Sequence, residues 1–367
     1  MINILFDHQI FTMQAYGGIS RYFANINHYA NKEDDLQTDI TLLKTNNHYI
    51  RDFPAPLNNF IGDILLSKQR KLFRWNERYA AYRIKQGNFD ILHPTYYNPY
   101  FLKDNKMPYV ITVHDMIHEL FPEYFDPGDI FVRYKRMCIE NAAHIIAISS
   151  TTKEDLKQIL GVHDSRISVI HHGSTAALVS VDEVAPRDGA NYLLFVGERR
   201  GYKNFFKFIS AVAPLLHKDL SLVIICAGGG AFQDAERETF SRLKITQQIS
   251  QRGVSDLELR QLYKNAIAFI YPSLYEGFGL PILEAFQNGC PVIASDTPCF
   301  KEIGQNALAY FNPTDEHDIL RTIETVMTSE AERQVMAARG KILLSNFAME
   351  KCIDKTLSVY RNIAQKS

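Results

Sequence analysis

Two glutamates eight positions apart, Glu276 and Glu284, lie on either side of a short glycine-containing loop. The backbone between them offers the N–H groups of Gly277, Phe278, Gly279 and Leu280. Pro281 then stands where a helix is expected to begin, and glycines beside a helix N-terminus form a site for an anion such as phosphate. Because a carboxylate accepts hydrogen bonds from paired hydroxyls, the pattern suggests recognition of a sugar and a ribose beside a phosphate. The alternative is an ordinary β-α-β unit with two solvated glutamates.

Cationic and imidazole side chains follow other apolar runs that have the length of strands. Arg199 and Lys203 follow YLLFV, while His93 follows DIL and His114 follows YVITV. Arginine can bind a pyrophosphate through two hydrogen bonds and lysine adds a point charge, so the pair could stabilise a departing nucleotide diphosphate without a metal. The structural alternatives are a solvated turn for the cations and a core position for the histidine, with His114 satisfied by Asp115.

A glycine pair, Gly17-Gly18, lies between an apolar run at 2–6 and a helical pattern that begins at Ile19. A strand, a glycine pair and a helix in this order allow backbone N–H groups to approach a phosphate. The segment lacks the three spaced glycines of the dinucleotide fingerprint. Taken alone, it is a weak indication of a phosphate loop.

The elements that must position these residues alternate between strand and helix in both halves of the chain. Strands are expected at 2–6, 38–43, 90–92, 109–113, 144–148 and 167–170, and again at 192–196, 222–226, 267–271, 292–294 and 308–311. This alternation predicts an α/β protein with two parallel-sheet domains, 1–173 and 190–348, joined by a linker at 174–189. Ligands of such sheets bind beyond the carboxyl ends of the strands, so we expect a substrate cleft between facing domains.

The composition and the cysteine and histidine spacing argue against nucleic-acid binding and against a metal site. The 367 residues are 46% hydrophobic and 22% charged, with a net charge of −1, which gives no reason to expect nucleic acid as a partner. Five cysteines show no metal-type spacing, and His171-His172-Gly173 is not spaced like a metal site. We interpret Ser149 and Ser150 as caps of a helix that begins near Thr152 and not as nucleophiles.

The N-terminus lacks the pattern of a signal peptide and no apolar run approaches ~20 residues, so we expect a cytoplasmic protein. Contact with a membrane surface stays open because of the basic, aromatic segment 66–85. In it Arg70, Arg74 and Arg78 repeat every four residues, and Leu72, Trp75, Tyr79 and Tyr82 fall at helical spacing. This helix could touch anionic lipid or a lipid-linked pyrophosphate acceptor. The alternative is a core-packed helix with a solvated basic face.

The segment SLYEGFGLPILEAFQNGCPVIAS resembles the signature of retaining glycosyltransferases of the GT-B fold, in glycosyltransferase family 4. The resemblance spans nearly the whole chain through GGISRY, VITVHDMIHELFPEYF, IIAISS, FVGERRGYKNF and ALAYFNPTD. The form of VHD and GYKN is similar to enzymes of O-antigen and capsule assembly, many of which use GDP-mannose. In such enzymes the final helix crosses back, so residues 349–367 are expected to join the N-terminal domain.

The resemblance implies a role for each matching position. Glu276 would face the donor sugar, and Glu284 would hold the ribose hydroxyls. Arg199 and Lys203 would hold the diphosphate, and His114 would lie near the donor sugar and the acceptor hydroxyl. The remaining donor contacts would come from Gly17, Gly18, Val254, Gly277, Phe278, Gly279 and Leu280, with Val254 beside the nucleotide base.

Two departures from the family pattern bear on these roles. Relatives often place the functional histidine in an H-x-H pair, where this chain has His93 and Thr95, so the choice between His93 and His114 is open and we favour His114. Relatives also often have an arginine where this chain has Tyr202.

The resemblance implies transfer of a hexose, mannose from GDP-mannose, to a hydroxyl of a saccharide or of a polyprenyl-diphosphate-linked saccharide, without cofactor or metal. The alternatives are a transferase that uses a UDP-sugar, a sugar-nucleotide epimerase on the same fold, and a non-catalytic protein that binds the ligand.

Overall fold

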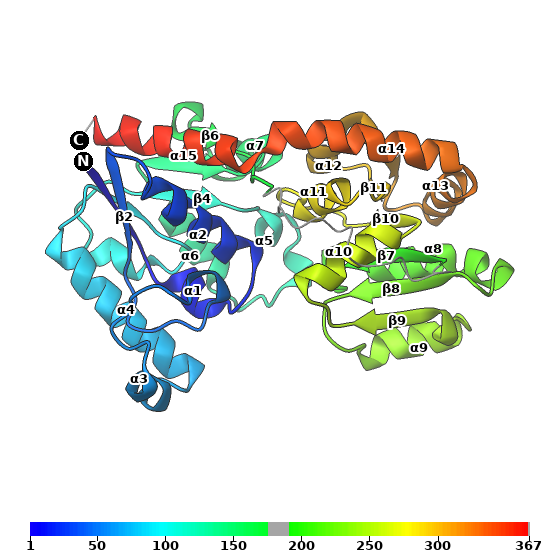
Figure 1. Cartoon of the computed structure of the whole chain (residues 1–367), viewed down its shortest axis with the longest axis horizontal. Coiled ribbons are helices and arrows are strands. Elements are labelled where there is room, and N and C mark those ends of the chain that lie inside the picture. Colours follow the sequence, from blue (N-terminus) through cyan, green and yellow to red (C-terminus); the bar gives the residue numbers. More distant parts are fainter. Residues whose placement is uncertain (175–190, 366–367) are drawn as a thin grey trace. The chain divides into compact units, whose positions relative to one another are not determined.

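The computed structural model describes residues 1–174 and 191–365 (Figure 1). The chain divides into two compact units: unit 1 consists of 1–173 with 349–367, and unit 2 of 174–348. Apart from Ser174, the linker predicted at 174–189 lies outside the described residues.

Unit 1 is built on parallel strands. One three-stranded sheet has the order β2 (Leu36–Ile40), β1 (Ile2–Phe6), β3 (Ile91–His93), and another has the order β4 (Val110–Val113), β5 (His144–Ala147), β6 (Ile167–Val169). A parallel bridge between Leu92 and Tyr109 joins β3 to the start of β4. The strand order therefore reverses direction between β1 and β3, which is where a ligand site is expected in an open α/β sheet.

The helices of unit 1 differ widely in length. They are α1 (Gln9–Met13), α2 (Gly18–Ala30), α3 (Phe60–Leu65), α4 (Gln69–Gln86), α5 (Ile117–Leu120), α6 (Phe131–Glu140), α7 (Ser150–Leu160) and α15 (Met349–Ala364). The capping role predicted for Ser149 is confirmed, since its hydroxyl accepts a hydrogen bond from Thr152 N at 3.0 Å. The same role predicted for Ser150 is wrong, because α7 begins at Ser150 itself and not near Thr152.

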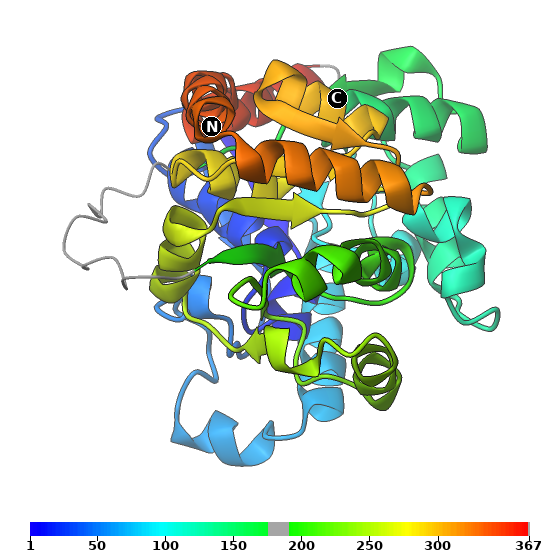
Figure 2. The ribbon, with the colours of Figure 1, turned by 90° about the vertical axis from the view of Figure 1, so that its right-hand side faces the viewer.

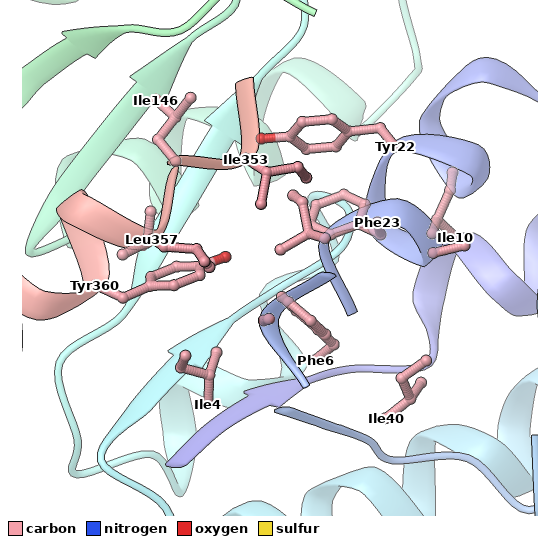
Figure 3. Close-up of a cluster of buried hydrophobic side chains, with 14 of the residues drawn as sticks. Ile4, Phe6, Ile10, Tyr22, Phe23, Ile40, Ile146, Ile353, Leu357 and Tyr360 are labelled. Atoms are coloured by element: carbon pink, nitrogen blue, oxygen red, sulfur yellow. The ribbon is translucent and has the colours of Figure 1, made fainter. Parts of the chain in front are cut away.

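The core of unit 1 joins the two ends of the chain (Figure 3). Phe6 of β1 meets Phe23 of α2 edge to face, with ring centroids 5.7 Å apart. Ile353, Leu357 and Tyr360 of α15 are buried in the same cluster. Burial of such side chains contributes about 1.5–3 kcal/mol each, so α15 is an integral part of unit 1.

Unit 2 contains one parallel sheet of six strands in the order β12 (Leu308–Phe311), β11 (Val292–Ser295), β10 (Ala268–Tyr271), β7 (Tyr192–Val196), β8 (Val223–Ala227), β9 (Ile249–Arg252). Figure 1 labels β11, β10, β7, β8 and β9 of this sheet in that order, and Figure 2 shows the sheet from another side. The chain enters the sheet at β7, continues to one side through β8 and β9, and then returns to the other side through β10, β11 and β12. The switch point therefore lies between β7 and β10.

The helices that connect these strands are α8 (Phe205–Lys218), α9 (Asp234–Arg242), α10 (Asp256–Asn265), α11 (Leu280–Gln287), α12 (Pro298–Gly304), α13 (Glu316–Thr328) and α14 (Glu330–Leu343). Phe195, Phe205 and Phe208 are buried between β7 and α8, which makes an aromatic centre for the core. The predicted α/β class with two parallel, Rossmann-like domains is confirmed. Within the described ranges, no helix is both long and apolar enough to cross a membrane.

Candidate active site

The centre of the candidate site is an ion pair at the switch point of unit 2. Lys203 follows β7 and Glu276 follows β10, and Lys203 Nζ lies 2.6 Å from Glu276 Oε1. Leu274 N also donates to Tyr202 O at 2.8 Å, which ties the two loops together. The side chains of Lys203 and Glu276 are 19% and 10% exposed, so the pair is largely shielded but still reachable from solvent. The topology thus brings together two residues that are 73 positions apart in sequence.

Other groups fix the orientation of the Glu276 carboxylate. The buried Ser273 hydroxyl donates to Glu276 Oε1 at 2.7 Å. Tyr271 is buried beside it, and burial together with the Glu276 charge raises the Tyr271 pKa well above its usual value. Lys203 Nζ lies 5.1 Å from the Tyr202 ring centroid and 5.9 Å from that of Tyr271. A lysine and a carboxylate held in this way can bind a diphosphate and a sugar hydroxyl without rearranging.

The loop after Glu276 leads directly into α11. Gly279 is the N-cap residue with φ of +126°, a conformation that favours glycine. Cys299 Sγ donates to Phe278 O at 2.6 Å, which anchors the loop from α12. The helix begins at Leu280, with Pro281 in its first turn as expected. This geometry places the positive end of the α11 dipole beside Glu276 and Lys203, a position that suits an anionic ligand.

Glu284 lies in the second turn of α11 and is partly buried. Its Oε2 accepts a hydrogen bond from Tyr263 OH of α10 at 3.2 Å. Burial, with the neighbouring carboxylate, raises the Tyr263 pKa well above its usual value, so this tyrosine stays a neutral donor. Val254 is half-buried between the end of β9 and the Ser255 cap of α10, at the same edge of the sheet.

Arg199 has a different environment from the one expected of a diphosphate ligand. Its side chain is only 3% exposed, and Nε lies 2.5 Å from Glu236 Oε1 of α9. The other guanidinium nitrogens donate to backbone carbonyls of the loop after β8, at Gly228, Gly229, Gly230 and Ala231. Nε, Nη1 and Nη2 therefore all donate to protein acceptors, with Nη2 shared among three carbonyls. The structure therefore places Arg199 in a buried network and not beside Lys203.

The loop that Arg199 holds has an unusual backbone. Gly228, Gly229 and Gly230 have φ of +79°, +67° and +70°, which turns their carbonyls toward the guanidinium. A Cβ at Gly229 would lie 2.5 Å from Gly197 O and 2.6 Å from Arg199 Nη1, so no larger residue fits there. The neighbouring Arg200 is exposed and lies 3.6 Å from Glu198.

In unit 1 the two candidate histidines have contrasting surroundings. His93 is fully buried, with Nδ1 2.6 Å from Tyr360 OH and Nε2 3.0 Å from Thr112 Oγ1. Both ring nitrogens are therefore used inside the core, and burial lowers the His93 pKa to about 3. This histidine fixes α15 against the sheet and has no ring nitrogen left for a ligand.

His114 follows β4 and is 8% exposed. Within the described residues its buried Nδ1 has no hydrogen-bond partner. Asp115 does not satisfy it: that carboxylate accepts from Ile117 N at 3.1 Å and lies 3.7 Å from Lys135 Nζ. Burial, His93 and Lys135 lower the His114 pKa to about 3, so the imidazole is neutral at physiological pH. The placement favours His114 over His93 as the histidine that meets a ligand.

His114 is part of an aromatic group that the sequence did not reveal. The His172 ring is stacked on it with centroids 5.7 Å apart, and Tyr22 of α2 meets both rings edge to face. From the sequence, His171-His172-Gly173 could only be excluded as a metal site by its spacing. The signal available was that His114 follows β4 and His172 follows β6. These strands belong to one parallel sheet, on either side of β5, so their carboxyl ends lie at the same edge.

Gly17 and Gly18 lie at the N-terminus of α2, with Gly17 as its N-cap. Gly17 O accepts from Arg21 N and from Ser20 Oγ, both at 3.1 Å. Gln14 Oε1 accepts from Ser20 N at 3.4 Å, so a side-chain oxygen already lies beside the first turn of the helix. In residues 1–174 and 191–365 no group of three or more His, Cys, Asp or Glu side chains could hold a metal ion.

The fold and these residues define a class of protein: a two-domain enzyme with Rossmann-like units, one of which presents a charged site at its switch point. Comparison with protein families identifies the class. Residues 16–175 match the family described as Glycosyltransferase Family 4, and residues 180–342 match Glycosyl transferases group 1.

Curated relatives include bacterial mannosyltransferases. The chain is 30% identical to the O-antigen chain mannosyltransferase RfbU of Salmonella typhimurium over 244 residues, about two thirds (66%) of each protein. It is 25% identical to the O-antigen chain mannosyltransferase B of Escherichia coli over 313 residues, 77% of each protein. The chain therefore belongs to the glycosyltransferases that combine these two family domains.

Solved structures share the fold. Sucrose-phosphate synthase from Thermosynechococcus elongatus superposes with a TM-score of 0.74 at 17% identity, covering 100% of both chains. Anabaena HepE in complex with UDP and glucose superposes with a TM-score of 0.72 at 16% identity, covering 99% of this chain and 100% of that one. The GT-B fold expected from the sequence is confirmed.

Proposed function

We propose that the protein transfers mannose from GDP-mannose to a saccharide hydroxyl, with retention of the anomeric configuration. The observation that carries this proposal is the Lys203–Glu276 pair, 2.6 Å apart at the switch point and directly before the N-terminus of α11. Similarity to O-antigen chain mannosyltransferases supports mannose as the sugar.

Each residue has a defined part in the proposed reaction. Lys203 and the N-terminus of α11 stabilise the negative charge that grows on the departing diphosphate. Glu276, fixed by Ser273, accepts hydrogen bonds from sugar hydroxyls. Glu284 accepts from the ribose hydroxyls. His114 offers a neutral imidazole that hydrogen-bonds a sugar or acceptor hydroxyl.

The bond changes need no protein nucleophile. The bond from sugar C1 to the diphosphate oxygen breaks through an oxocarbenium-like state, and the acceptor oxygen bonds to C1 on the same face. The acceptor proton passes to an oxygen of the departing diphosphate. A double-displacement mechanism needs two carboxylates flanking the scissile bond, about 5–5.5 Å apart, a role that Glu284 on the ribose cannot fill.

The acceptor that we propose is a saccharide, free or carried on a polyprenyl diphosphate. The second form would bring the enzyme to the cytoplasmic surface of a membrane. We propose that the transfer itself uses no cofactor and no metal. A second candidate function is transfer from a UDP-sugar, because Anabaena HepE, which has the same fold, was solved with UDP and glucose.

Thermal denaturation with GDP, UDP and ADP, each alone and as a sugar nucleotide, tests the donor. A ligand that binds only the folded state stabilises it by about 2.7 kcal/mol at a hundredfold excess over Kd. We expect GDP and GDP-mannose to raise the melting temperature selectively. A selective shift with UDP would overturn the donor assignment, and no shift with any nucleotide would contradict glycosyl transfer.

The NMR coupling constants of the product's anomeric carbon test the stereochemistry. An α-linked product from the α-linked donor is expected, and a β-linked product would exclude the retaining mechanism. An epimerase would convert its sugar nucleotide with no acceptor present.

A further inference from the structure

Helix α3 presents a cluster of apolar side chains to solvent. Phe60, Ile61, Ile64 and Leu65 are 77%, 61%, 61% and 48% exposed, and they occupy four of the six positions of the helix. Single exposed apolar residues are normal on protein surfaces, but a contiguous group marks a contact with another apolar phase. Figure 1 shows α3 at the outer edge of unit 1, beyond the end of α4.

The rest of α3 is firmly attached. Asn59 caps the helix by accepting from Gly62 N at 3.0 Å, and Gly62 itself is buried. Asp63 forms an ion pair with Lys44 at 2.6 Å. Leu66, which begins the connection to α4, is 3% exposed. The apolar residues are therefore held outward by the fold and are not exposed by fraying of the helix.

Helix α4 continues this surface with positive charge. Its buried side is formed by Leu72, Asn76, Ala80 and Ile84, not by the Leu72, Trp75, Tyr79 and Tyr82 series noted in the sequence. Asn76 is anchored through its Oδ1, which accepts from Leu43 N at 2.8 Å, and its Nδ2, which donates to Lys44 O at 2.8 Å.

The opposite side of α4, with the segment before it, exposes six cations: Lys68, Arg70, Lys71, Arg74, Arg78 and Lys85. Across the described parts of the chain, none of these six forms an ion pair. By contrast, Arg83 on the same helix pairs with Asp39 at 2.8 Å. Trp75 and Tyr82 are 45% and 60% exposed among these cations. Exposed apolar residues, unpaired lysine and arginine, and interfacial aromatics are the composition of a surface that binds anionic lipid.

We propose that α3 and the exposed side of α4 form a membrane-binding surface, in which the apolar residues of α3 enter the bilayer interface and the cations of α4 bind anionic lipid headgroups. A second copy of the chain is a poorer occupant, because a self-complementary contact would place six unpaired cations against six. This surface would bring the proposed transferase to a lipid-linked acceptor, but its test does not depend on the transfer reaction.

Co-sedimentation with vesicles tests the proposal. Vesicles of phosphatidylcholine are compared with vesicles that contain about 30% phosphatidylglycerol, a fraction that gives the surface a strong negative potential. We expect at least about tenfold more protein on the anionic vesicles at low salt, with the difference reduced at ~0.5 M NaCl. The double variants Phe60→Ser/Ile64→Ser and Arg70→Glu/Arg74→Glu should each lose most of this binding.

Matched control variants substitute exposed apolar and cationic residues of unit 2 in the same way. Leu220→Ser alters a residue that is 80% exposed, and Arg242→Glu/Lys341→Glu removes two exposed cations. Both should bind like the wild type, and all variants should keep the wild-type melting temperature and nucleotide-induced shift.

Equal binding of the wild type to neutral and anionic vesicles, or equal loss in the controls, would overturn the proposal. The proposal would also be overturned if light scattering showed a wild-type dimer that does not bind vesicles and that dissociates in the Phe60→Ser/Ile64→Ser variant.

Discussion

Two buried ion pairs in unit 2 have the same chemistry and different consequences. Lys203–Glu276 is partly open to solvent, and its two residues lie in the connections that follow β7 and β10 at the switch point. Arg199–Glu236 is closed, with side chains 3% and 5% exposed, and Glu236 also accepts from Gln233 N at the start of α9. Sequence alone cannot separate the two cases, because Arg199 and Lys203 follow the same strand. The difference arises from the β8–α9 loop, whose carbonyls surround the guanidinium.

This contrast predicts that Arg199 contributes mainly to the stability of unit 2 and not to ligand binding. Arg199→Ala leaves Glu236 buried without its partner and frees the loop carbonyls, so we expect a loss of about 3–5 kcal/mol in the free energy of unfolding. The neighbouring Arg200→Ala alters an exposed pair and should change stability by less than about 0.5 kcal/mol. Urea unfolding of both variants measures the difference. Equal stability together with weakened diphosphate binding in Arg199→Ala would show instead that the guanidinium binds ligand.

At the scale of elements, α11 connects the phosphate site to Glu284. If Glu284 binds the ribose, Glu284→Gln should weaken GDP binding by about tenfold to a hundredfold, since hydrogen bonds to a charged group contribute about 1.5–3 kcal/mol. Turnover at saturating donor should change little, because this contact is the same in the ground and transition states.

Calorimetric titration with GDP and 2′,3′-dideoxy-GDP measures that contact directly. The variant should lose affinity for GDP and not for the dideoxy analogue. Tyr263→Phe, which keeps the carboxylate, is the matched control and should have a smaller effect. Equal losses for both nucleotides in Glu284→Gln would mean that the carboxylate does not reach the ribose.

Most strands could be predicted within one or two residues because they are continuous apolar runs buried on both faces, as β7 and β10 are. Two strands differ from the prediction. β2, predicted at 38–43, spans Leu36–Ile40. β9, with sequence ISQR, was not predicted; it lies at the edge of the sheet and has one buried residue. An edge strand with polar side chains has no periodic pattern to detect. The buried side of α4 could not be predicted either. A polar residue, Asn76, lies at its centre and hydrogen-bonds the backbone of Leu43 and Lys44.

Some residues of the candidate site could likewise be predicted from the sequence, and others could not. Glu276, Glu284 and the α11 loop could be found because they are local in sequence. Ser273 and Tyr263 could not, because their contacts with the two glutamates depend on how loop and helix pack. The choice between His93 and His114 likewise required Tyr360 and Thr112, which occupy both nitrogens of His93.

At the scale of the molecule, buried histidines make unit 1 sensitive to acid. Burial lowers the pKa of His8, His93, His114 and His172 to about 3, while in the unfolded chain their pKa is near 6.5. Between these values the unfolded state binds more protons, so stability is complete above about pH 6.5 and is lost as the pH falls toward 3. Each imidazole contributes up to about 1.4 kcal/mol of loss per pH unit in that window.

Urea unfolding from pH 7.5 to pH 5 tests this prediction. The single tryptophan, Trp75, belongs to unit 1 and reports its unfolding by fluorescence. We expect the urea midpoint of the Trp75 signal to fall steadily below about pH 6.5. A midpoint that stays constant to pH 5 would mean that these imidazoles are not buried in neutral form.

The release of GDP from GDP-mannose by the wild type and by Glu276→Gln tests whether Glu276 takes part in breaking the bond between sugar and diphosphate. The amide keeps the size of the carboxylate but removes the charge that pairs with Lys203 and accepts sugar hydroxyls. Slow hydrolysis is measurable without the acceptor, and a saccharide extract should accelerate it. We predict that the variant binds GDP nearly as well as the wild type and releases it from the donor at least about a hundredfold more slowly. Equal rates in the two proteins would contradict the account.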